Sequence, residues 1–134
     1  MSRSISDASP LTECEPLVHS ALAFATLILR YSDSLYPFGL LSIAGDVQPV
    51  MSEQPERQLS GVIEEIEWLI FERSFQTPYS ASVIVYLADV ENDDGSFEDV
   101  IFTRIKDERG TEISRLYPYA LTSSGVVIGK PYCI

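Results

Sequence analysis

The sequence ASVIVYLADV, residues 81–90, is apolar on both of the faces that alternate along an extended chain. A strand of this kind needs a layer of side chains on each side, so it lies inside a sheet and not at its edge. The acidic segment 91–95 follows, and its Asp-Gly pair suits the positive backbone φ of a hairpin turn. We therefore expect residues 81–90 to form the central strand of an antiparallel sheet.

The segments after this strand keep the two-residue period. We expect strands at 97–106 and 112–117, joined by a turn at 107–110, and a short last strand at 125–128. Pro118 should interrupt the second of these strands, because proline has no N–H to donate to a ladder. Strands that are joined by turns this tight run antiparallel to one another.

The segments before the central strand predict a helix and then a hairpin. Apolar residues from Leu17 to Tyr31 cover two faces of a helix, which Thr12 or Glu13 should cap. A helix with so little polar surface must be sandwiched in the fold or lie at a subunit contact. The hairpin that follows covers residues 36–51, and Pro49 marks its second strand as an edge strand.

A second helix should separate this hairpin from the central strand. Ser52 should cap it, Pro55 should lie in its first turn, and Pro78 should end it. Most of its acidic side chains fall opposite an apolar stripe, which consists of Leu59, Val62, Ile63, Ile66, Leu69 and Ile70.

This order of elements predicts an α+β protein. Two main helices pack on an antiparallel sheet of about five strands, in the order helix, hairpin, helix, three-strand meander. We expect residues 1–134 to form a single domain and the serine-rich residues 1–11 to be disordered. The same element order is found in the roadblock and profilin-like group of small modules, an analogy of order without a shared motif.

Composition excludes two classes of partner. The formal net charge is −11, and a protein that binds nucleic-acid phosphates or an anionic membrane needs an excess of Lys and Arg instead. The longest apolar segment covers residues 17–29, well short of the roughly 20 residues that span a bilayer. Without an export signal, and with Cys14 and Cys133 as the only cysteines, we expect a cytoplasmic protein with reduced thiols; a bridge between these two is the alternative.

The common catalytic and metal-binding signatures are missing. His19 is the only histidine, which excludes a two-histidine metal site, and the sequence contains no GxGxxG, GxxxxGK[ST] or GxSxG motif. The acidic loop that begins at Asp89 fails the EF-hand register, because Asp94 falls where glycine is required and Val100 falls where the bidentate glutamate belongs. We expect no catalytic residue, no metal and no cofactor.

The negative charge is concentrated between residues 51 and 110. This concentration predicts a docking face for a basic protein, because a negative patch speeds the encounter and selects the partner. The candidate residues are Glu64, Glu65, Glu67, Glu72, Asp93 and Asp94, with Trp68 as an aromatic anchor. A purely solubilising surface is the alternative interpretation of the charges, and a core position is the alternative for Trp68.

Two short motifs carry a resemblance. The segment Tyr36-Pro37-Phe38-Gly39 and the later segment Leu116-Tyr117-Pro118-Tyr119 resemble elements of a group of small uncharacterised bacterial proteins, over about residues 20–130. The resemblance implies no activity and no catalytic residue. Four aromatic side chains of these motifs either pack in the core or form a ligand-contacting cluster across the sheet: Tyr36, Phe38, Tyr117 and Tyr119.

The sequence thus favours a small acidic bacterial protein-binding module without catalytic function. Its concrete form is an immunity or inhibitor protein that covers the basic surface of a partner protein. The alternatives are a structural or regulatory homodimer, formed through the first helix or an open sheet edge, and a small-ligand-binding domain.

Overall fold

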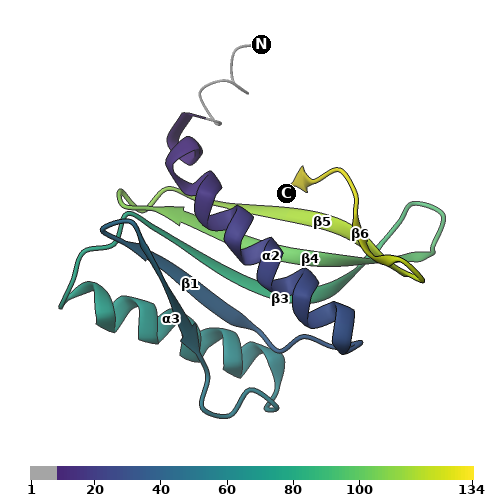
Figure 1. Ribbon diagram of the computed structural model, residues 1–134, viewed down its shortest axis with the longest axis horizontal. Coiled ribbons are helices and arrows are strands. Elements are labelled where there is room, and N and C mark those ends of the chain that lie inside the picture. Colours follow the sequence, from purple (N-terminus) through teal and green to yellow (C-terminus); the bar gives the residue numbers. More distant parts are fainter. Residues whose placement is uncertain (1–8) are drawn as a thin grey trace.

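The computed structural model describes residues 9–134, with side chains from residue 12 onward (Figure 1). It confirms the α+β class and the order helix, hairpin, helix, meander. The described chain contains η1 (Ser9–Cys14), α2 (Glu15–Tyr31), β1 (Phe38–Ile43), β2 (Asp46–Met51), α3 (Leu59–Ser74), β3 (Ala81–Glu91), β4 (Phe97–Asp107), β5 (Glu112–Thr122), β6 (Gly125–Ile128) and β7 (Tyr132–Cys133).

All seven strands belong to one curled antiparallel sheet. The strand order is β2-β1-β3-β4-β5-β6, and β7 pairs with β5. The predicted central strand is confirmed, since β3 lies between β1 and β4, with Val85 opposite both Phe38 and Thr103. The prediction that Pro49 lies in an edge strand is also confirmed, because β2 ends the sheet.

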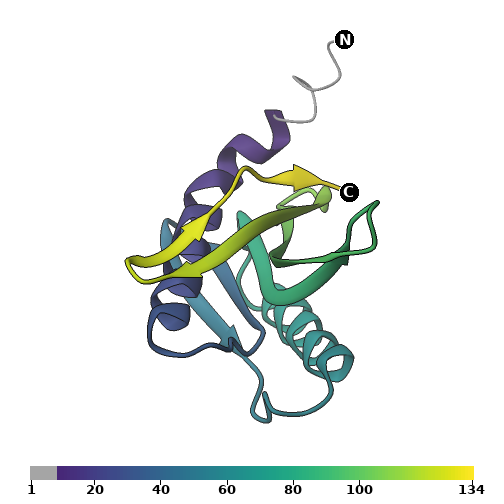
Figure 2. The same cartoon turned by 90° about the vertical axis from the view of Figure 1, so that its right-hand side faces the viewer.

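The two helices cover opposite faces of this sheet (Figure 2). Residues of β1 alternate between the two cores: Phe38 and Leu40 are buried in the core under α2, and Leu41 is buried in the core under α3. The same alternation in β3 sends Val83 toward α2 and Ile84 toward α3. The apolar character of both faces of β3 follows from this three-layer arrangement.

Helix α2 buries only one side. Its core residues include Ala21 and Ala25, both fully buried, whose small side chains let the helix lie close to the sheet. Of the two predicted alternatives, a sandwiched helix is wrong for the described chain, because Phe24, Leu27 and Tyr31 remain 48–79% exposed, and a helix at a subunit contact stays a prediction.

Helix α3 lies close to β1 at Gly39. It buries Val62, Ile66 and Ile70 against the sheet. A Cβ atom added to Gly39 would lie 3.0 Å from Cγ2 of Ile66, so no side chain fits there without movement. The glycine of the Tyr-Pro-Phe-Gly motif therefore has a packing role, which is to admit α3.

Both helices begin later than the sequence predicts. The Ser52 hydroxyl accepts the Gln54 N–H at 3.0 Å and donates to Oε1 of Glu65 at 2.6 Å, so Ser52 organises a loop and α3 starts at Leu59. The N-cap position of α2 is Cys14, which makes no side-chain cap, because η1 leads directly into the helix. Helix α3 also ends at Ser74, four positions before Pro78, so Pro78 is not the residue that ends it.

Pro118 does not interrupt β5. It occupies the last register position of the β4–β5 ladder, opposite Val100, and β5 pairs with β6 from Tyr119 onward. A missing N–H is tolerated where a strand leaves one ladder and enters another.

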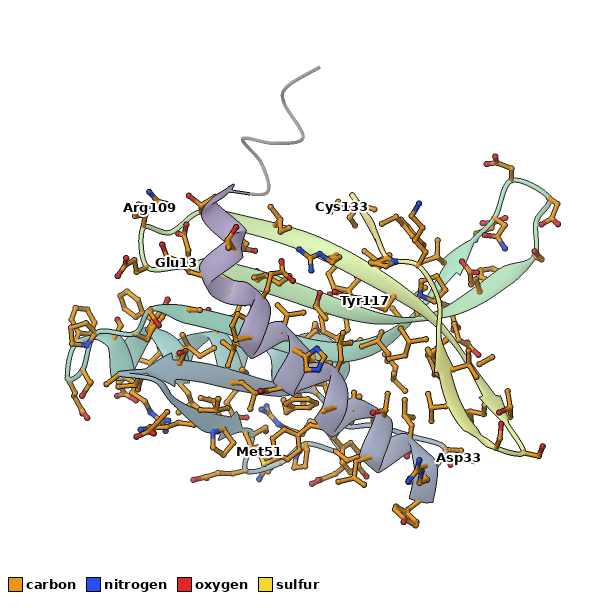
Figure 3. The ribbon with its side chains drawn as sticks, turned by 45° about the horizontal axis from the view of Figure 1, so that its top comes forward. Glu13, Asp33, Met51, Arg109, Tyr117 and Cys133 are labelled. Carbon is orange, nitrogen blue, oxygen red and sulfur yellow. The ribbon has the colours of Figure 1, made fainter. Side chains whose placement is uncertain are left out.

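The two ends of the chain differ in part from expectation. Of residues 1–11, which were predicted to be disordered, residues 1–8 lie outside the described part, and residues 9–11 belong to η1. The alternative of a disulfide is wrong: Cys14 is buried and Cys133, labelled in Figure 3, is exposed, and both are free. Within the described residues, no helix has the length and apolar character needed to cross a membrane.

Candidate functional site

Three aromatic side chains form an exposed stripe along α3, which we call the aromatic ridge. It consists of Trp68, Phe71 and Phe75, which are 58%, 52% and 74% exposed. Their spacing of three and four residues puts them on one side of the helix, and Val62, Ile66 and Ile70 occupy the opposite side. The ridge therefore lies on the outer surface of α3, and the Phe71 ring also borders the space between the helix and the sheet.

The rings of the ridge support one another. The ring centroids of Trp68 and Phe71 are 5.8 Å apart, and those of Phe71 and Phe75 are 4.9 Å apart with nearly perpendicular planes. Edge-to-face geometry of this kind is the favourable one for aromatic pairs. Phe75 is the C-cap residue and keeps helical dihedral angles (φ −74°, ψ −24°), so it continues the stripe beyond the last residue of α3.

Two free carboxylates flank the ridge. Glu64 and Glu72 are exposed, and within the described part of the chain neither forms an ion pair. They are the two predicted partner-binding acids that lie on the same helix surface as Trp68. The ridge and these two carboxylates make up the candidate docking surface.

Glu65 has a different environment. Its carboxylate accepts hydrogen bonds from the Ser52 hydroxyl at 2.6 Å, from the Glu53 N–H at 3.2 Å and from the Arg57 guanidinium at 2.6 Å. These hydrogen bonds, together with the positive charge of Arg57, hold the pKa of Glu65 below its usual range. Glu65 therefore fixes the loop between β2 and α3 and is not free to meet a partner.

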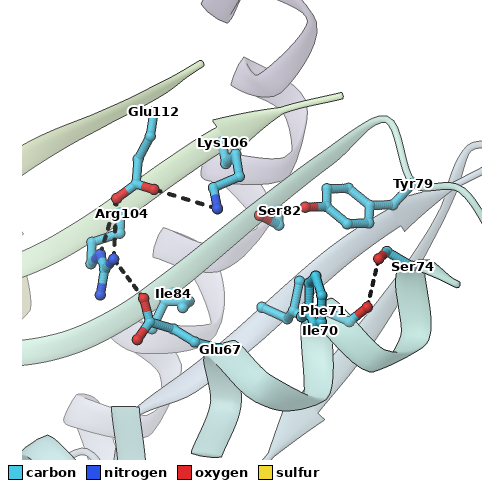
Figure 4. A pocket seen from close by; sticks show the side chains of 10 residues that line it. All are labelled: Glu67, Ile70, Phe71, Ser74, Tyr79, Ser82, Ile84, Arg104, Lys106 and Glu112. Atoms are coloured by element: carbon cyan, nitrogen blue, oxygen red, sulfur yellow. Dashed lines mark hydrogen bonds and ion pairs between the residues drawn. The ribbon is translucent and has the colours of Figure 1, made fainter. Parts of the chain in front are cut away.

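Glu67 lies on the side of α3 that faces β4. Arg104 contacts Oε2 of Glu67 at 2.6 Å and Oε2 of Glu112 at 3.2 Å, and Lys106 lies 3.5 Å from the other oxygen of Glu112 (Figure 4). Burial acts to lower the pKa of Arg104, but the two carboxylates outweigh it and raise that pKa. The four side chains form a chain of alternating charge with no net charge of its own.

This chain of charges borders a small cavity between α3 and the sheet. The cavity measures about 100 Å³, and Ile70, Phe71, Tyr79 and Ile84 are among the residues that line it. Ligand sites for drug-sized molecules are larger, at about 300–1,000 Å³. With its charges already paired and its volume small, the cavity gives no support to a ligand site.

Asp93 and Asp94 lie at the tip of the β3–β4 hairpin. Asp94 accepts hydrogen bonds from the N–H and the hydroxyl of Ser96 at 2.9 and 2.6 Å, which lower its pKa. Phe97, next to this tip, lies seven positions before Arg104 in β4, a length of about 23 Å along the strand. The predicted acidic residues therefore do not form one continuous face.

The four aromatic residues of the two short motifs do not meet either. Phe38 on β1 and Tyr117 on β5 are buried in the core under α2, with two strands between them, whereas Tyr36 is 58% exposed ahead of β1. Tyr119 lies two residues beyond Tyr117 and is half-buried at the rim of the same core. This placement matches aromatic packing more closely than a ligand cluster.

A pair of carboxylates lies away from the ridge. Asp89 and Asp99 are directly opposite each other on β3 and β4. Asp99 is exposed, and a hydrogen bond between the two side chains, followed by a loss of solvation and by the like charge of Asp89, raises its pKa. The described residues include no group of three or more His, Cys, Asp or Glu side chains that could hold a metal ion.

Trp68 was predicted as a partner-binding residue from the sequence, whereas Phe71 and Phe75 were not. The signal was available, because three aromatic residues at positions 68, 71 and 75 share a helical stripe whichever way that stripe faces. Of the six residues of the predicted apolar stripe, Val62, Ile66 and Ile70 are buried, whereas Leu59 is 44% exposed. An aromatic stripe on the opposite side of the helix from these buried residues has to be exposed.

Comparison with known proteins places no constraint on this site: no protein-family model, no curated protein and no solved structure matches the chain. The resemblance to small bacterial proteins and the analogy with the roadblock and profilin-like group stay predictions.

Proposed function

We propose that this chain is a small non-enzymatic protein-binding module that docks onto a basic partner protein through the aromatic ridge. In its concrete form it is an immunity or inhibitor protein that covers the basic site of that partner. The observation that carries the proposal is a row of three rings, each more than half exposed, on the outer side of a helix whose inner residues Val62, Ile66 and Ile70 are buried.

The ridge has the properties of an interface centre. Trp is among the residues whose loss costs the most binding energy in protein interfaces, and aromatic residues are enriched there. The Trp68–Phe71 and Phe71–Phe75 contacts restrict the rings before any partner arrives. A restricted surface loses less side-chain entropy on binding, which favours affinity.

The charge around the ridge supports a basic partner. Glu64 and Glu72 are unpaired beside it, and the whole chain carries a formal charge of −11. The negative charge of this chain attracts a basic protein over a distance. Because Glu64 and Glu72 have no ion pair within the described part of the free chain, docking on them breaks none. Binding of this kind weakens as salt screens the charges.

The experiment compares ridge variants with a matched aromatic control. Trp68→Ala and Phe75→Ala truncate exposed rings of the ridge, and Phe97→Ala truncates a ring that is 68% exposed at the β3–β4 hairpin. Each tagged protein is incubated with lysate of the source cells, and bound proteins are identified by mass spectrometry. Products of neighbouring genes are the first candidates for titration with purified protein.

The proposal expects a basic protein that the native chain and Phe97→Ala retain and both ridge variants lose. Each ridge variant should weaken binding at least about tenfold, and raising NaCl from about 0.05 to 0.5 M should weaken it further. A basic partner that binds the ridge variants as tightly as the native chain would contradict the proposal, as would self-association alone at every salt concentration.

A further inference from the structure

A second apolar surface lies on the opposite side of the sheet from the aromatic ridge. Phe24, Leu27 and Tyr31 form an exposed stripe on α2, and Val47 and Met51 of β2 are 43% and 60% exposed. We call these five residues the α2–β2 patch; Figure 3 labels Met51.

The register of the sheet joins the two parts of this patch. Met51 is paired with Phe38, and the Phe38 ring contacts that of Phe24 edge-to-face, with 6.3 Å between centroids. Val47 lies four positions before Met51 and so shares its face of β2. The patch therefore runs from the α2 stripe onto the face of β2 that carries Phe38 and Leu40 in the neighbouring strand.

The charge distribution sets this surface apart from the rest of the molecule. Residues 17–51 contain only Arg30, Asp33 and Asp46 as charged side chains, a net charge of −1 within the total of −11. Two copies of such an acidic chain repel each other wherever their acidic surfaces meet. The α2–β2 patch lies in this nearly neutral segment, so two copies that approach through it meet little repulsion from its own side chains.

The patch contains a projection, and a recess adjoins it on the side of β6. Tyr31 is 79% exposed at the end of α2, and a hollow of about 370 Å³ opens between α2 and β6, lined by Ala23, Thr26, Leu27, Arg30, Val126 and Ile128. Of the patch residues, Leu27 also lines this hollow, so the hollow adjoins the patch on the side of β6. A two-fold interface uses the same surface on both subunits, so each copy presents its projection and the adjoining hollow to the other.

We propose that the α2–β2 patch is a homodimer interface, with a second copy of this chain as its occupant. The two copies pack face to face through α2 and do not extend the sheet, because Pro49 lacks the N–H that an added strand would use. The interface is independent of the aromatic ridge, which lies on the other side of the sheet.

The test measures the monomer–dimer equilibrium by sedimentation equilibrium from low to hundreds of micromolar protein. The native chain should dimerise by tens of micromolar, and about 0.5 M NaCl should tighten the dimer because it screens the repulsion between two acidic copies. This salt response has the opposite sign to that expected for the basic partner.

Charge-introducing variants locate the interface. Leu27→Glu and Tyr31→Glu each place two like charges at a two-fold contact and should raise the dimer dissociation constant at least about tenfold. Phe97→Glu adds the same charge to an exposed ring elsewhere and should change that constant less than about twofold, and Phe75→Glu should behave in the same way. Circular dichroism spectra verify that each variant is folded.

Several outcomes would overturn this proposal. A native chain that stays monomeric at hundreds of micromolar in high salt has no such interface, and flotation of that monomer with phosphatidylcholine vesicles would assign the patch to a lipid surface. A dimer that Leu27→Glu and Tyr31→Glu leave intact but Phe75→Glu dissociates would place self-association on the ridge. Self-association through the ridge would also contradict the proposed function. A monomer that still binds a basic partner would overturn only the homodimer and would leave the proposed function intact.

Discussion

Gly39→Ala tests the close approach of α3 to β1, on which the position of the aromatic ridge depends. The added Cβ would lie 3.0 Å from Cγ2 of Ile66 and 3.5 Å from Cδ1 of Ile70. Carbon atoms attract best at about 3.5–4.0 Å, so the contact with Ile66 is too short and the contact with Ile70 is acceptable. The variant must therefore move one side chain or shift the helix.

The expected effect is a net loss of stability. Overpacking of a core costs about 1–3 kcal/mol, and replacing glycine by alanine returns about 0.4–1 kcal/mol by restricting the unfolded chain. Gly39 has no positive φ, so alanine meets no backbone strain there. We expect Gly39→Ala to lower the free energy of unfolding by about 0.5–2 kcal/mol, measured by urea denaturation followed by far-UV circular dichroism.

Two further variants make the result specific. At Gly61, within α3, an added Cβ meets only a side-chain nitrogen of Arg57 at 3.7 Å, so Gly61→Ala should stabilise the chain by about 0.5–1 kcal/mol. Ile66→Leu removes Cγ2, so in the double variant with Gly39→Ala the loss should be smaller than the sum of the two single losses. A Gly39→Ala protein as stable as Gly61→Ala, or strict additivity in the double variant, would refute the packing argument.

Three other predictions concern titratable groups. Asp107 is 2% exposed and accepts the N–H groups of Arg109 and Thr111, both at 2.9 Å; these hydrogen bonds outweigh burial and lower its pKa. The Asp107 carboxylate stabilises the fold above its unfolded pKa of about 3.9, and this stabilisation is lost as the pH falls. In urea titrations, the free energy of unfolding should therefore fall more steeply with decreasing pH for the native chain than for Asp107→Asn. Equal slopes of this free energy against pH would contradict the argument. The raised pKa of Asp99 makes stability depend on pH in the opposite direction from that at Asp107. The protonated Asp99 side chain beside Asp89 stabilises the fold, and this stabilisation is lost as the pH rises. Asp99→Asn should therefore be more stable than the native chain at pH 7, with a difference that shrinks below about pH 4; a native chain that is the more stable one at pH 7 would count against the pairing. Burial, followed by nearby acidic charges, raises the pKa of the Cys14 thiol to about 11. A thiol reagent such as Ellman's should therefore label Cys133 in the native protein and Cys14 only after denaturation. Equal labelling rates for the two cysteines would show that Cys14 is accessible.

The order of the elements could be predicted because hydrophobic period and turn residues are local signals. The apolar character of both faces of residues 81–90 led directly to the central strand, and the paired strands around it followed from short turns. The start of α3 was predicted too early because Ser52 and Pro55 have the pattern of a helix start. In the structure, the Ser52 hydroxyl donates a hydrogen bond to Glu65, thirteen residues later, and so does not cap the helix. A side chain that could cap a helix can instead form a hydrogen bond to a group that the tertiary structure brings near. The sequence does not show which group that is.

The candidate site was predicted only in part for a related reason. Trp68, Glu64 and Glu72 share one surface as expected, but Glu65 and Glu67 are held by Arg57 and Arg104. Arg104 comes from a strand almost forty positions away in the chain, so the neutralisation of Glu67 depends on tertiary contacts alone. Charge counted along a segment thus overstates the charge that a surface presents.

The placement of the two helices on opposite faces of one sheet has a consequence for valency. A dimer built through the α2–β2 patch would keep both aromatic ridges on its outer sides, so each dimer could engage two partner molecules at once. Where the partner is itself multimeric or fixed to a surface, the second contact forms at a high effective concentration, and apparent affinity rises without any new contact. A variant such as Leu27→Glu would then lower apparent affinity for an immobilised partner and leave the affinity for a single partner molecule in solution unchanged.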